Sequence, residues 1–171
     1  MDSIVVGFSK PNGWFEPFSW LIRLMTWCSF SHAYIKYYNS YADRWITFQA
    51  SGLAVNFMGQ IMFDGKEDIY AEFEIPISEA TKLKTVQFAI DNVGAPYAIG
   101  QILGFPIVWF MSWFGKKISN PLYSGSNYFC SELVSDVINE IEAGKLNASV
   151  MTPKDLYNWI VSKGYQKLPA G

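Results

Sequence analysis

The sequence predicts an α+β domain, because strand-like segments dominate the first half of the 171-residue chain and helical segments the second. Short runs rich in β-branched and aromatic residues predict strands over 3–9, 31–38, 45–51, 53–58 and 69–77. Apolar residues at helical spacing predict helices over 16–28, 79–93, 130–142 and 153–163. No repeat or linker-like stretch divides the chain, so we expect one domain over residues 1–171.

Local signals support the individual elements. The stretch NSYADR between 31–38 and 45–51 predicts a hairpin, and Pro76 suits a strand end or an edge. Ser78 is the expected N-cap of the helix over 79–93, and Gly94 its stop. Thr152, followed by a proline and an acidic third residue, begins the last helix, which ends at Gly164. One face of the helix over 79–93 carries apolar residues: Ala80, Leu83, Val86 and Ile90.

Composition limits the classes of function. Half of the residues are hydrophobic and 18% are aromatic, which is typical of a folded domain and not of a disordered chain. The formal net charge of −2 argues against a nucleic acid or an anionic membrane bound through charge. We expect the partner to be a small-molecule, peptide or lipid-like substrate, and the protein to be a monomer.

Cysteine and histidine usage argues against metals and disulfides. The chain has two cysteines, Cys28 and Cys130, and one histidine, His32. These residues cannot build a disulfide framework or a zinc site with four ligands, so we expect no metal and no cofactor. The first residues have no signal-peptide pattern, which predicts a cytoplasmic protein or a phage-encoded protein acting in the host cell.

The most apolar segment covers 98–115, and Gln101, glycines and Pro106 interrupt it. It falls short of the roughly 20 uninterrupted apolar residues that a membrane-spanning helix needs. We interpret it as a buried or lid-like helix pair. A contact with a membrane surface is the less favoured alternative.

Cys130 stands at the start of the predicted helix over 130–142. It lies on the same stripe as the apolar residues Leu133, Val134, Val137, Ile138 and Ile141. The unpaired N–H groups and positive dipole of a helix start favour a thiolate. A cysteine on this stripe can equally be a packed core residue.

His32 and Gln49 offer partners for a cysteine nucleophile. A nucleophilic cysteine needs a base, and His32 is the only imidazole in the chain. In the predicted hairpin Gln49 lies opposite His32, or diagonal to it after a register shift of two residues. Its amide oxygen could then orient the imidazole, which would favour a thiolate–imidazolium pair. A structural histidine and an ordinary polar strand residue are the alternatives.

Five segments in this order resemble the circularly permuted branch of the NlpC-type papain-like hydrolases, with the YiiX-like group nearest: LIRLMTWCSFSHAYIKY, ITFQASGLAVNF, GAPYAIGQILG, NYFCSELV and MTPKDLYNW. In that branch the cysteine helix follows the histidine strand. The resemblance implies a permuted papain-like core, in which an antiparallel sheet packs against the cysteine helix. It implies that Cys130 is the nucleophile, His32 the base and Gln49 the third polar residue. The group often has a glutamate at the position of Gln49. The amide found here leaves open how basic His32 is.

The resemblance also implies a site-lining or oxyanion role for Tyr97, which otherwise is an anchoring aromatic. Within the aromatic block 105–114, Trp109 and Trp113 are candidates for the wall of a substrate groove, although the block can equally be a core element. The implied activity is that of a cysteine hydrolase of peptidase or amidase type, from a phage or a bacterium. It would cleave an amide bond, such as one in a cell-wall peptide, or an ester or acyl bond, through a thioacyl-enzyme.

Two other functions remain open. The first is a non-catalytic module that binds a lipid or peptide on the same fold. The second is an acyltransferase similar to lecithin:retinol acyltransferase. The Ser-Glu-Leu that follows Cys130, in place of the Glu-His-Phe of that group, favours the hydrolase.

Overall fold

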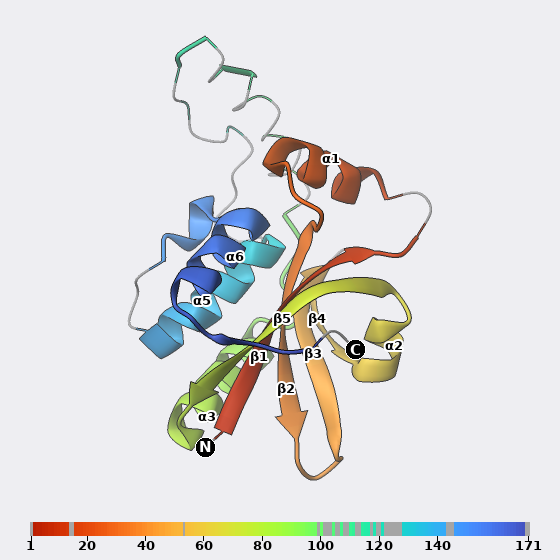
Figure 1. Ribbon diagram of the computed structural model, residues 1–171, viewed down its shortest axis with the longest axis vertical. Coiled ribbons are helices and arrows are strands. Elements are labelled where there is room, and N and C mark those ends of the chain that lie inside the picture. Colours follow the sequence, from red (N-terminus) through yellow and green to blue (C-terminus); the bar gives the residue numbers. More distant parts are fainter. Residues whose placement is uncertain are drawn as a thin grey trace.

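The computed structural model describes residues 2–13, 16–52, 54–98, 128–142 and 146–169, and positions 100, 104, 107, 110–111, 114–116, 118 and 121 between them. A six-stranded antiparallel sheet with the order β4-β3-β2-β1-β5-β6 organises this part of the chain (Figure 1). The strands are β1 (Asp2–Pro11), β2 (His32–Asn39), β3 (Arg44–Ser51), β4 (Ala54–Gly59), β5 (Glu67–Ile77) and β6 (Gln166–Lys167). The α+β prediction is confirmed. The short β6, which pairs with β5 near Phe73, was not predicted.

Helices lie on both sides of this sheet. They are α1 (Pro17–Thr26), α2 (Gln60–Asp64), α3 (Glu79–Asp91), α5 (Cys130–Glu142) and α6 (Pro153–Ser162), with a short 3-10 turn at Ala148–Val150. The helices predicted over 16–28, 79–93, 130–142 and 153–163 are present, and α2 is an addition to them. The predicted caps are confirmed as well. The Ser78 hydroxyl accepts a hydrogen bond from the Thr81 N–H, and Thr152 forms a capping box with Asp155.

The main core lies between one face of the sheet and helices α3, α5 and α6 (Figure 1). On β2, Ala33, Ile35 and Tyr37 belong to this core, together with Leu133 and Val137 of α5. The cysteine-bearing helix therefore packs against the antiparallel sheet. His32, Tyr34 and Lys36 are buried on the opposite face of this strand, as the alternation of side chains along a strand requires.

Helix α3 does not turn its predicted apolar stripe inward. Leu83 and Ile90 stay exposed, whereas Thr85 and Ala89 are buried. The physical reason is close packing. Small side chains at Thr85 and Ala89 let the helix approach the sheet, where the Tyr37 hydroxyl donates a hydrogen bond to the Thr85 carbonyl at 3.3 Å. Contact with the sheet decides which face is buried here, and the apolar periodicity does not.

A glycine is required at position 7 by the packing on the face of the sheet opposite the main core. It is the register partner of Tyr34, and a Cβ built on Gly7 would lie 2.1 Å from the Tyr34 ring. The Tyr34 hydroxyl donates to Glu72 at 2.8 Å, and the ring packs on Phe63 of α2 with centroids 4.4 Å apart. The ring therefore has no free direction in which to move.

The substitution Gly7→Ala is expected to lower the free energy of unfolding by about 3 kcal/mol, the upper end of the usual cost of overpacking. Urea denaturation followed by circular dichroism measures this effect. Gly59→Ala is the matched control, because a Cβ at Gly59 meets no atom within 4 Å. Equal midpoints for the two variants would contradict the steric argument.

Within the described residues, no helix combines the length and the apolar character needed to cross a membrane. The predicted helix pair over 98–115 falls largely on positions outside the described residues, so that prediction stays open.

Candidate functional site

Three predicted site residues meet where β2, β3 and α5 come together. His32 is the first residue of β2, Gln49 lies on β3, and Cys130 is the first residue of α5. All three side chains are buried, and Cys130 is 0% exposed. The structure therefore brings together, at one end of the sheet, residues that the sequence separates widely.

The hairpin register gives His32 its polar partner. Ile35 pairs with Phe48, so Gln49 lies diagonal to His32, which is the second of the two predicted registers. The His32 Nε2 and Gln49 Oε1 atoms are 2.8 Å apart and share a hydrogen bond. Since Nε2 is engaged in this way, Nδ1 is the ring nitrogen left for the cysteine.

Asn56 is a supporting residue that the sequence analysis missed. It is the register partner of Gln49 on β4, and its Oδ1 accepts a hydrogen bond from Gln49 Nε2 at 3.4 Å. This contact turns the amide nitrogen of Gln49 away from His32, so the amide oxygen faces the imidazole. Pairing 45–51 with 53–58 in the sequence would have placed Asn56 near Gln49.

The Cys130 side chain lies next to the His32 imidazole and acts on it through its charge and hydrogen bonding. The thiol also lies 3.8 Å from the Ser31 carbonyl oxygen, to which it donates in its protonated form. Burial alone would lower the pKa of His32. The hydrogen bond and negative charge of Cys130, the charge of Glu67 and the hydrogen bond of Gln49 outweigh burial and raise this pKa to about 9. The arrangement favours the imidazolium form of His32.

Tyr97 completes the surroundings of the sulfur. A short parallel bridge pairs Tyr97 with Tyr128, two residues before Cys130, and the Tyr97 side chain lies next to that of Cys130. Burial and the charge and hydrogen bonding of Cys130 together raise the pKa of Tyr97 well above its usual range. Tyr97 therefore keeps its proton and acts as a donor toward negative charge.

Glu67 is a second supporting residue that the sequence analysis missed. Its carboxylate accepts a hydrogen bond of 2.8 Å from the hydroxyl of the buried Ser9, and Ser9 is the register partner of His32. The negative charge of Glu67 is one of the influences that raise the pKa of His32. The sequence offers no signal for this proximity, because Glu67 belongs to a strand that does not pair with β2.

A groove of about 530 Å³ opens beside these residues. Ser31, His32, Gln49 and Tyr97 form one side of it, and the buried Cys130 is not among the lining residues. The remaining wall comes from the start of α1, the ends of β1 and β3, and the region around α2: Pro11, Asn12, Gly13, Glu16, Phe18, Ser19, Ile22, Ser51, Gly52, Met58, Phe63, Lys66 and Glu67. The predicted groove residues Trp109 and Trp113 lie outside the described residues, so their placement stays a prediction.

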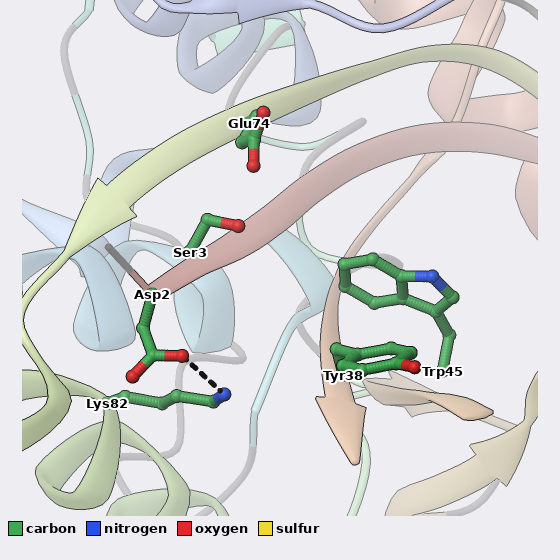
Figure 2. Close-up of a pocket in the computed structure, with 6 residues that line it drawn as sticks. All are labelled: Asp2, Ser3, Tyr38, Trp45, Glu74 and Lys82. Atoms are coloured by element: carbon green, nitrogen blue, oxygen red, sulfur yellow. Dashed lines mark hydrogen bonds and ion pairs between the residues drawn. The ribbon is translucent and has the colours of Figure 1, made fainter. Parts of the chain in front are cut away.

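A second hollow, at the opposite end of β2, differs in chemistry (Figure 2). Its walls carry an ion pair of 3.2 Å between Lys82 and Asp2, and Tyr38 packs on Trp45 with ring centroids 5.3 Å apart. Its lining residues include no histidine, whereas the groove described above includes His32. We therefore assign the reactive chemistry to the groove beside His32.

Among the described residues, no group of three or more histidine, cysteine, aspartate or glutamate side chains could hold a metal ion. Models of known protein families give no match to this chain, and curated protein sequences give no significant match. The function is therefore argued from the geometry.

Proposed function

We propose that this protein is a cysteine hydrolase that cleaves an amide or ester bond through a thioacyl-enzyme. The observation that carries the proposal is that Cys130 lies next to the His32 imidazole, which Gln49 holds by a hydrogen bond at the wall of a groove. A nucleophile that contacts its base, which a third polar group orients, is the arrangement that nucleophilic catalysis requires. The resemblance to the circularly permuted NlpC-type papain-like hydrolases adds to it, because the same residues match that family's catalytic positions.

In the first half-reaction the Cys130 thiolate attacks the substrate carbonyl carbon, and a C–S bond forms. The negative charge that develops on the carbonyl oxygen is stabilised by the Tyr97 hydroxyl and by the N–H of Cys130 at the start of α5. As the C–N or C–O bond breaks, the His32 imidazolium gives its proton to the departing amine or alcohol.

In the second half-reaction the neutral His32 imidazole takes a proton from water. The resulting hydroxide attacks the thioester carbonyl, the C–S bond breaks, and the carboxylic acid leaves. This restores the thiolate and the imidazolium. Gln49 stays neutral throughout, and its role is to hold the imidazole in the orientation that serves both steps.

Alkylation of the two cysteines tests the proposal within one molecule. We expect iodoacetamide at neutral pH to modify Cys130 about tenfold faster than Cys28, although Cys28 is more exposed, because the thiolate is the reactive form. Peptide mass spectrometry at timed quenches measures both rates.

His32→Ala is expected to slow the modification of Cys130 below that of Cys28, and to leave the rate at Cys28 unchanged. Cys28 thus serves as the internal control for reagent concentration and for the integrity of the fold. Modification of Cys130 at the same rate with and without the imidazole would contradict the hydrolase and favour a binding module.

A further inference from the structure

Helix α1 is apolar on two opposite faces. Its inner face places Ile22 against Cys130 and lines the groove with Phe18. Its outer face carries Trp20, Leu24 and Trp27 at spacings of four and three residues, which places them on one side of a helix. A helix that is apolar all round is normally buried on every side. In this structure the outer face is exposed.

Trp27 is the extreme case. Its side chain is 84% exposed, and its backbone adopts the left-handed conformation with φ 50° at the end of α1. This conformation is unfavourable for any residue with a Cβ. Trp20 is also 59% exposed, although tryptophan is among the residues that gain most from burial.

A second set of exposed apolar side chains lies at the same end of the molecule. Ile107, Phe110 and Phe114 are all exposed, and the rings of Phe110 and Phe114 contact each other at 5.1 Å between centroids. Figure 1 shows the described positions of this segment beside and above α1, at the upper end of the long axis. We call the following six residues the apolar end: Trp20, Leu24, Trp27, Ile107, Phe110 and Phe114.

The charged residues in the sequence stretches that contain the apolar end are all positive. The stretches 17–27 and 98–121 contain Arg23, Lys116 and Lys117 but no aspartate or glutamate, while the whole chain has a net charge of −2. Every acidic residue therefore lies elsewhere in the sequence. The net charge of the whole chain argued against an anionic membrane. That value does not show that these two stretches carry only positive charges.

The combination of aromatic rings and cations indicates what binds to the apolar end. Trp and Phe side chains favour the boundary between lipid headgroups and acyl chains, and Arg and Lys favour anionic headgroups. A second copy bound through the same surface would bring like charges together, which disfavours a symmetric dimer.

We propose that the apolar end docks this protein on the surface of a membrane that contains anionic lipids. The docking does not depend on the proposed hydrolase activity. It places the groove at the membrane surface, because Phe18 and Ile22 of the same helix form part of the groove wall.

Vesicle co-sedimentation tests the docking. The wild-type protein is expected to pellet with vesicles of equal parts phosphatidylcholine and phosphatidylglycerol, and to pellet less with phosphatidylcholine alone or at high salt. The double variant Trp20→Ser/Trp27→Ser is expected to lose affinity for the anionic vesicles by about tenfold or more, because two interfacial rings are removed. The control Tyr41→Ser/Leu83→Ser removes two exposed apolar side chains outside the apolar end and is expected to bind like the wild type.

The variant Arg23→Gln/Lys116→Gln provides a second measurement that preserves every aromatic contact. It is expected to reduce the difference between anionic and neutral vesicles. Wild-type protein that stays in the supernatant with anionic vesicles would overturn the proposal. So would serine variants that bind like the wild type, or a dimer in sedimentation velocity that dissociates on Trp27→Ser and occludes the apolar end from vesicles.

Discussion

The substitution Cys130→Ala is expected to reduce turnover of an activated ester such as p-nitrophenyl acetate by about three orders of magnitude or more, as removal of a catalytic nucleophile usually does. The reason is that the proposed mechanism passes through a covalent acyl intermediate on the Cys130 sulfur, which alanine cannot form. Release of p-nitrophenolate measures the rate, and intact mass spectrometry of the wild type is expected to detect one acetyl group on Cys130.

Cys28→Ala is the control for this prediction. Cys28 is a free cysteine that packs at the margin of the main core and does not line the groove, so its removal is expected to leave the rate within about twofold of the wild type. If Cys130→Ala kept the wild-type rate, or if the acetyl group appeared on Cys28, the proposed mechanism would be wrong.

The titration of His32 is the second large effect, and it is directly observable because the chain contains one histidine. In the folded wild type the pKa of His32 is raised to about 9, so the imidazolium persists from acid pH up to that value. Burial is the largest single influence and acts in the opposite direction, and Cys130 supplies the strongest influences that overcome it. In Cys130→Ala the pKa of His32 is therefore expected to fall well below 9, because the two strongest raising influences are lost while burial stays.

The His32 ring resonance in a carbon-correlated proton NMR spectrum, followed against pH, measures this change. Gln49→Leu, which removes a weaker contribution, is expected to lower the pKa of His32 by less, and Cys28→Ala is expected to leave it unchanged. The raised pKa of His32 also has a kinetic consequence. Hydrolysis of substrates whose leaving group needs a proton is expected to decline as the pH rises through about 9, because His32 then loses the proton it must donate. A His32 titration that Cys130→Ala leaves unaltered would contradict the ion pair.

The parts of the fold that local chemistry determines could be predicted from the sequence. The hairpin of β2 and β3 follows from two strand patterns around a polar loop, and the caps at Ser78 and Thr152 follow from side chains that satisfy the first N–H groups of a helix. The contact between His32 and Gln49 was also accessible, because the hairpin leaves few registers.

The remaining features depend on contacts between distant segments. The inward face of α3 is set by how closely Thr85 and Ala89 can approach the sheet, and a periodicity of apolar residues does not record this distance. Glu67 reaches the neighbourhood of His32 through Ser9 on the intervening strand, so neither sequence spacing nor strand pairing with β2 indicates it. Asn56 is an intermediate case. Its position beside Gln49 can be predicted once the register of the β3–β4 hairpin is known.

The position of α1 has a consequence for how the reaction starts. Ile22 of this helix packs on Cys130, and the Ser19 hydroxyl bonds to the Ser31 hydroxyl at 2.6 Å, directly before His32. The sulfur is therefore closed to solvent in this structure, and a substrate or an alkylating reagent reaches it only when α1 shifts. Such gating sets a ceiling on the acylation rate that the chemistry of Cys130 does not determine.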